Sequence, residues 1–187
     1  MHRPAPSDPD RPSGAVRVDA RTKKLTKRLQ AGEIAVIDHT DLDRVAAEAL
    51  VEARPAAVLN AAPSVSGRYP NLGPGILLDA DVPLIDALGP DIMRLHEGQH
   101  VEVDIDGEGD EAAKVRVAGE SGVLAEGVLQ TRRTIEAAMD AAREGLSVQL
   151  EAFAANTMDY LRGERDLLLN GVGVPEIRTQ MSGRHVL

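Results

Sequence analysis

The residues with the clearest chemical potential lie in a loop between Pro55 and Gly75, whose sequence is PAAVLNAAPSVSGRYPNLGPG. Short polar side chains, glycine amides and one arginine are groups that proteins use to hold a phosphate-like anion. The candidate anion-binding residues are Asn60, Ser64, Ser66, Gly67, Arg68 and Asn71. The alternative is a rigid turn in which Arg68 pairs with a carboxylate of its own domain. That alternative is favoured because no GxxxxGK or GxGxxG pattern is present.

The segments on either side of this loop predict where it lies in the fold. The apolar run Ala56–Leu59 has the length of a buried strand, and Pro74 is suited to the first turn of a helix. A loop between a strand and a helix is where α/β proteins often place ligands. The sequence therefore places the candidate site at the end of a buried strand.

A second polar cluster, Asp38, His39, Asp41 and Asp43, has the composition of a metal site. Carboxylates at the start of a helix are also stabilised by the helix dipole without any metal, and Thr40 or Asp41 is a suitable N-cap. The structural explanation is favoured, and His39 is expected to be a loop histidine. We predict no catalytic residue, no metal site and no cofactor in this chain.

Composition narrows the class of protein. The 187 residues are 43% hydrophobic but only 2% aromatic, so the core must consist of aliphatic side chains. The absence of cysteine excludes disulfides and thiolate chemistry. No apolar run approaches the roughly 18 residues of a membrane span. These features are compatible with a reducing cytoplasm.

The charge is unevenly distributed along the chain. The first 30 residues carry a net charge of +5, and the remaining residues carry −14, which gives the total of −9. An acidic body argues against nucleic-acid binding. We expect residues 1–24 to form a disordered basic arm. The arm either contacts an anionic membrane surface or an acidic partner, or is a solvated tail, which is the favoured interpretation.

Residues 25–130 are expected to form one compact α/β domain. Apolar segments at 33–38, 56–59 and 83–85 alternate with two helical patterns, which predicts a mostly parallel sheet. Alternating residues from Val101 to Ile105 and from Lys114 to Ala118 then predict a β-hairpin.

Residues 131–170 predict one long helix that connects or assembles domains. Apolar residues recur every three or four positions from Ile135 to Leu168, which is the helical repeat. This stripe is longer than one small domain can cover, and its two candidate covers are a following C-terminal domain and a second copy of the chain. A homodimer is expected, because a two-fold contact uses one patch twice. The residues expected near its centre are Leu146, Leu150, Phe153, Thr157 and Leu161. Residues 171–187 are expected to begin a further, truncated C-terminal domain.

Four strings in the sequence support a family resemblance. They are RTKKLTKRL, VLNAAPSVSGRYPNLGP, EGLSVQLEAFAANTMDYL and RDLLLNGVGVPEIRT. From about Arg21 to Leu187 the chain resembles the N-terminal half of the SteA family of bacterial cytokinetic-ring proteins. The resemblance implies a thiamine pyrophosphokinase-like domain after this chain. It also implies a cytoplasmic protein that is recruited to the division site and acts with a membrane-anchored partner resembling SteB in separation of daughter cells.

The predicted domain is also similar in element order to the phosphohistidine swivelling domains, although no histidine stands in the loop from Ser64 to Arg68. Two function classes remain. The first is a non-enzymatic scaffold or regulator of cell division, which is favoured because no nucleophile–base pair is evident. The second is the accessory half of a nucleotide- or pyrophosphate-handling enzyme of thiamine pyrophosphokinase type.

Overall fold

The structure, a computed structural model, describes residues 11–67, 71–105 and 111–169, without the side chains of residues 163 and 165–169. The chain divides into two compact units, residues 1–146 and 147–187, and the boundary falls within the last helix. Residues 1–10, Arg68 and residues 171–187, which were expected to begin a further domain, lie outside the described residues.

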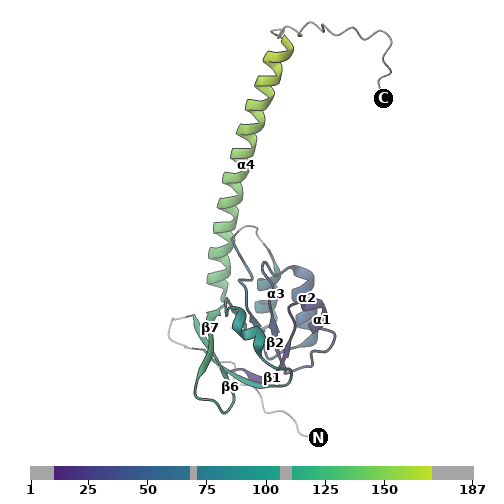
Figure 1. The fold of residues 1–187 in the computed structure, drawn as a ribbon, viewed down its shortest axis with the longest axis vertical. Coiled ribbons are helices and arrows are strands. Elements are labelled where there is room, and N and C mark those ends of the chain that lie inside the picture. Colours follow the sequence, from purple (N-terminus) through teal and green to yellow (C-terminus); the bar gives the residue numbers. More distant parts are fainter. Residues whose placement is uncertain (1–10, 68–70, 106–110, 170–187) are drawn as a thin grey trace, which may run out of the picture. The chain divides into compact units, whose positions relative to one another are not determined.

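The first unit is built on a closed barrel of mixed β-strands (Figure 1). The strands are β1 (Ser13–Val18), β2 (Ile34–Ile37), β3 (Ala57–Asn60), β4 (Leu84–Asp86), β5 (His100–Ile105), β6 (Ala112–Val117) and β7 (Val123–Leu129). Around the barrel their order is β1-β2-β3-β4-β7-β6-β5. Neighbours among β1 to β4 are parallel, and all other neighbours are antiparallel.

This closed barrel contradicts the predicted mostly parallel α/β sheet and its likeness to a swivelling domain. The difference arises at β1, which lies in the segment expected to be disordered. β1 pairs in parallel with β2 and antiparallel with β5, where Ala15 faces His100, and so joins the two ends of the sheet. Val16 is fully buried among the barrel residues. The disordered arm predicted for residues 1–24 is therefore wrong for the described part, 11–24.

Helices cover the outer face of the parallel strands. They are α1 (Thr22–Leu25), α2 (Arg44–Ala53) and α3 (Gly73–Asp79), while the 3₁₀ helix η1 (Pro90–Arg94) contributes Ile92 to the barrel interior. Alternate residues of β2 point to opposite faces: Ile34 and Val36 lie inside the barrel, and Ala35 and Ile37 pack with the helices. Burial on both faces explains the continuous apolar run of this strand.

The last helix, α4 (Arg132–Leu169), has nearly the bounds that periodicity predicted. Its first turn is attached to the first unit by two ion pairs, Arg132 to Asp79 at 2.6 Å and Arg133 to Glu111 at 2.8 Å. Ile135 and Ala142, farther along this part of the helix, are buried. One face of residues 132–146 of α4 therefore packs into the core of the first unit.

Candidate functional site

The carboxyl ends of the parallel strands bring together polar residues that are far apart in the sequence. Asn60 ends β3, Asp86 ends β4, and both are buried. The Asn60 amide nitrogen donates to Asp86 Oδ1 at 3.2 Å and to the His39 carbonyl at 3.0 Å. Asn60 Oδ1 accepts from the His39 amide at 2.9 Å. Asn60 was predicted to donate a hydrogen bond to an anion. Its side chain instead connects the ends of β2, β3 and β4.

Asp86 is the acceptor that fixes the start of the candidate loop. It accepts hydrogen bonds from the Ser64 amide, at 3.0 Å, and from the Ser64 hydroxyl. Burial raises the pKa of Asp86, and hydrogen bonds from Ser64 and Asn60 oppose that rise. The sequence did not indicate that Asp86 would accept hydrogen bonds from Ser64, because the two residues lie more than 20 positions apart.

Asp41 holds the second half of the loop in the same way. The Ser66 amide donates to Asp41 Oδ1 at 2.7 Å, and the Ser66 hydroxyl donates to Asp41 Oδ2 at 2.8 Å. Asp41 has a positive φ of 55°, which places it outside the helix, and Asp43 is the N-cap of α2 through its bond from the Ala46 amide. The predicted caps Thr40 and Asp41 are therefore wrong by two or three residues.

These contacts bear directly on the predicted anion site. The donors of Ser64 and Ser66 are engaged by two carboxylates of the same chain, so an added anion would have to displace them. The side-chain amide of Asn71 donates to the Ser64 carbonyl at 2.9 Å, and its Oδ1 is buried with no hydrogen-bond partner among the described residues. That oxygen needs a donor rather than an anion. Gly67 adopts φ +77°, a backbone conformation that glycine reaches without strain. Arg68 lies outside the described residues, so an anion bound there stays a prediction.

Both ring nitrogens of His39 have polar neighbours, which was not expected for a loop histidine. Its Nδ1 is 2.9 Å from Thr22 Oγ1, and its Nε2 is 3.7 Å from Asp43 Oδ2. In the sequence, only the i to i+4 spacing of His39 and Asp43 indicated that these two side chains lie close together. Thr22 is only 4% exposed, which withholds its hydroxyl from an incoming substrate. The geometry thus favours His39 as an imidazole held in place at a binding surface. It does not favour Thr22 and His39 as a nucleophile and its general base.

Described histidine, aspartate and glutamate side chains do not form a group of three arranged to hold a metal ion. Ion pairs instead join β1, the end of α1 and the η1–β5 connection. Arg17 contacts Glu33 at 2.7 Å and Glu97 at 3.2 Å, and Arg28 contacts Asp19 and Glu97. Hydrogen bonds, chiefly from Arg17, lower the pKa of Glu33 although burial opposes the change.

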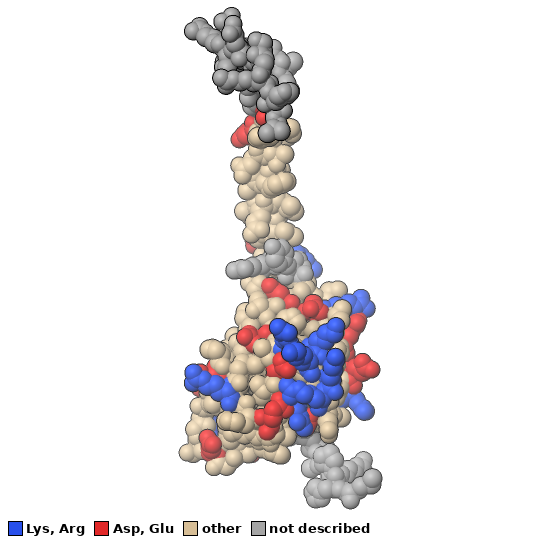
Figure 2. All heavy atoms as spheres, turned by 45° about the vertical axis from the view of Figure 1, so that its right-hand side comes forward, with Lys and Arg blue, Asp and Glu red and all other residues tan. Residues whose placement is uncertain are grey.

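Lysine and arginine side chains gather on the face that carries α1 and α2 (Figure 2). The exposed cations there include Arg21, Lys23, Lys24 and Lys27. Unlike Arg28 nearby, none of these four forms an ion pair within the part of the chain that the structure describes. The charge predicted for a disordered arm is therefore partly displayed on an ordered surface.

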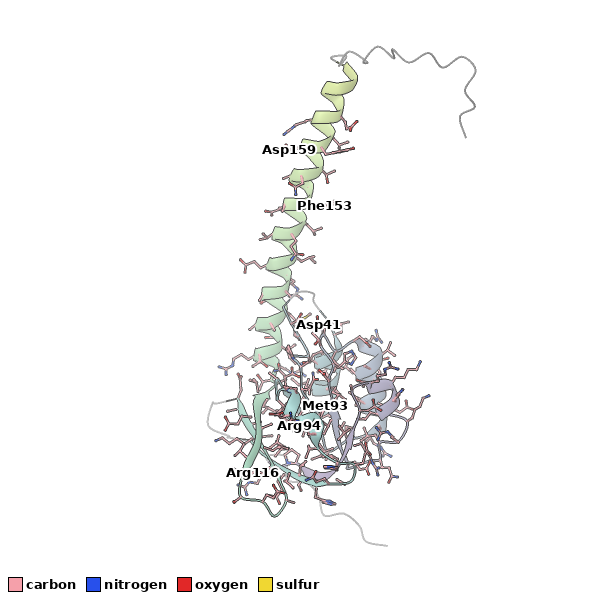
Figure 3. The ribbon with its side chains drawn as sticks, in the orientation of Figure 1. Asp41, Met93, Arg94, Arg116, Phe153 and Asp159 are labelled. Carbon is pink, nitrogen blue, oxygen red and sulfur yellow. The ribbon has the colours of Figure 1, made fainter. Side chains whose placement is uncertain are left out.

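The second unit displays the apolar stripe predicted for assembly. Leu150 is 59% exposed, Phe153 69% and Leu161 55%. Thr157 is also exposed, whereas Leu146, at the end of the first unit, is half-buried. Figure 3 shows the Phe153 side chain projecting from the helix. We call Leu150, Phe153, Thr157 and Leu161 the distal stripe.

Among the described residues, no helix combines the length and apolar character needed to cross a membrane. Neither a protein family, nor a curated protein, nor a solved structure matches this chain in the comparisons with known proteins.

Proposed function

We propose that this protein is a non-enzymatic scaffold that self-associates through the distal stripe of α4. The carrying observation is the exposure of Leu150, Phe153 and Leu161 on one face of a continuous helix. Fully burying a leucine or phenylalanine contributes about 1.5–3 kcal/mol. An ordered row of such side chains is thus a strong driving force for association.

The spacing of the stripe supports a second helix as its cover. Met139, Leu150 and Leu161 are each separated by 11 residues, and so are Ile135, Leu146 and Thr157. An 11-residue repeat corresponds to 3.67 residues per turn, which suits helices that pair nearly straight or with a slight right-handed supercoil. In the exposed part of the helix, from residue 147 onward, a repeat of this kind keeps Leu150, Thr157 and Leu161 on one face towards a partner helix.

A second copy of this chain is the proposed occupant. The distal stripe contains no charged residue, so two identical stripes meet without repulsion between like charges. A two-fold contact also uses the same patch twice, and each stripe residue is covered in both copies. We place Phe153 near the centre of this contact.

The resemblance to the SteA family gives the proposal a cellular setting. We propose that the scaffold acts in separation of daughter cells, is recruited to the division site, and works with a membrane-anchored partner of the SteB kind. In this setting, self-association multiplies the number of partner-binding surfaces held at one place.

Sedimentation velocity of the full chain at tens of micromolar tests the self-association. We expect a dimer for the unmodified protein and a monomer for Phe153→Glu. Val148→Glu is the matched control, because Val148 is 61% exposed but lies on the other side of the helix, so it should leave the dimer intact. A monomeric unmodified protein, or equal loss of the dimer in both variants, contradicts the proposal.

Calorimetric titration of the full chain with ATP and with thiamine tests the enzyme-like alternative. The scaffold proposal expects no saturable heat from either compound. Saturable binding of nucleotide by a chain that remains monomeric favours an accessory half of a nucleotide-handling enzyme instead.

A further inference from the structure

A groove between α1 and α2 is the second surface with a defined chemistry. It consists of two adjoining cavities of about 580 and 360 Å³, which share Thr26 and Ala49. The larger cavity extends to His39 at the carboxyl end of β2. The two cavities therefore lie side by side along α2 and meet at Thr26 and Ala49.

The floor of this groove is apolar. Ala46 and Leu29 are almost fully buried, Ala49 is half-buried, and Val45 is 76% exposed beside them. Alanine side chains leave the backbone of α2 accessible to close approach. Val45 is too exposed to belong to the floor and instead offers apolar surface beside it that a partner can cover.

One wall of the groove is cationic. Arg21 and Lys23 line the larger cavity, Lys27 lines the smaller one, and none of the three has an ion-pair partner among the described residues. Arg17 and Arg28 in the same region are each paired with carboxylates. Arg21, Lys23 and Lys27 thus lack ion-pair partners among the described residues, although the chain as a whole carries a net charge of −9.

The opposite wall carries carboxylates. Glu52 lines the smaller cavity, and Asp43 lines the larger one while capping α2. Asp38, just after β2, adds a third carboxylate to the larger cavity, so the carboxylates equal the cations Arg21, Lys23 and Lys27 in number. The groove therefore has a polarity across its width, with cations on the α1 side. An occupant must present negative charge towards α1 and apolar side chains towards Val45 and Ala49.

We propose that this groove binds an acidic amphipathic helix of a partner protein. Such a helix places apolar residues on one face and carboxylates beside them, which complements the floor and the α1 wall. A flat anionic membrane can reach the lysines but not the floor of a concave groove, so the shape favours a polypeptide. The charge complementarity chiefly increases the association rate and the specificity.

The probe is a labelled synthetic helix of about 16 residues, ~24 Å long, with Glu on its polar face and Leu and Ala on its apolar face. Fluorescence anisotropy with the full chain should show saturable binding that weakens as salt is raised. Two peptides serve as controls: a scrambled isomer of the same composition, and a version in which Lys replaces Glu. Both should bind at least ten-fold more weakly.

Variants of the protein locate the binding. The double variant Lys23→Glu, Lys27→Glu and the variant Val45→Ser should each weaken binding of the acidic helix, the former by at least ten-fold. Arg94→Glu reverses an exposed cation outside the groove and should leave the affinity unchanged. Circular-dichroism melting verifies that each variant folds.

Three results would overturn the proposal. The first is no saturable binding of the acidic helix. The second is equal binding of the scrambled isomer, or an equal effect of Arg94→Glu, which would indicate unspecific charge attraction. The third is binding to phosphatidylglycerol vesicles that depends on Lys23 and Lys27 while the helix does not bind, which would assign the cations to a membrane.

Discussion

The two halves of α4 carry the same apolar repeat but differ in what covers it. In residues 132–146, Ile135 is 9% exposed and Ala142 is fully buried. In residues 147–169, Leu150 and Phe153 are 59% and 69% exposed. One continuous pattern therefore begins as the core of the first unit and continues as surface in the second.

The contrast shows what periodicity determines and what it leaves open. Spacing of three and four residues determines which side chains share a face of the helix. Whether that face is covered depends on the length of the neighbouring elements. The Met139 sulfur still accepts a hydrogen bond from the amide of Asn71, in the loop before α3, at 3.2 Å. By contrast, every described side chain from 147 to 162 is exposed.

The largest expected effect separates the two halves by stability. Ala142→Glu places an unpaired charge at a fully buried position, which should lower the free energy of unfolding by about 3–5 kcal/mol. Ala155→Glu makes the same change at an exposed position away from the distal stripe and should be nearly neutral. Urea titration followed by circular dichroism measures both variants. Equal midpoints for the two would show that the first half of α4 is not part of the core.

An intermediate effect concerns acid and the ion pairs of the first unit. Because the folded-state pKa of Glu33 is lowered from 4.5, this glutamate stabilises the protein above pH 4.5, and the contribution is lost as pH falls through the lowered folded-state pKa. Glu33→Gln should lower the melting temperature by a few degrees at pH 7 and flatten its decline in acid. Glu151→Gln on the second half of α4 is the control. A variant whose melting temperature declines in acid as steeply as that of the unmodified protein would contradict the assignment.

The smallest expected effect sharpens the role of the distal stripe. Thr157 is its one polar member, and its hydroxyl donates to the Phe153 carbonyl at 2.8 Å. Thr157→Leu adds apolar surface to both copies of a symmetric contact, so dimer affinity should rise about three- to ten-fold. Ala155→Leu, off the stripe, should leave it unchanged. Sedimentation at several concentrations compares them, and a dimer weakened by Thr157→Leu would place Thr157 outside the contact.

Local pattern predicted most elements of the fold but not its closure. The apolar runs of β2 and β3, the alternation of β5 and the repeat of α4 each depend on neighbouring residues, and each element formed near its expected place. β1 lies among proline, aspartate and arginine, so its composition predicted disorder. Its order depends on pairing with β2 and with β5, and the β5 contact lies some 85 residues away.

The candidate loop illustrates the same limit at the level of single side chains. The sequence identified Asn60, Ser64 and Ser66 as hydrogen-bonding residues, but not their partners. Asp86 and Asp41 reach them because parallel strands end at one edge of the barrel. Distant carboxylates brought together by topology leave no signal in the local sequence.

Closure by β1 also has a consequence for the order of events during synthesis. β1 is synthesised well before β5, yet Ser13 pairs with Glu102 and Ala15 with His100. The barrel therefore stays open along one side of β1 until most of the first unit has been translated. Contacts of such long sequence separation slow folding, and an unpaired strand edge is prone to pair with other chains. A nascent chain of this protein therefore exposes one unpaired edge of β1 until β5 has been synthesised and pairs with it.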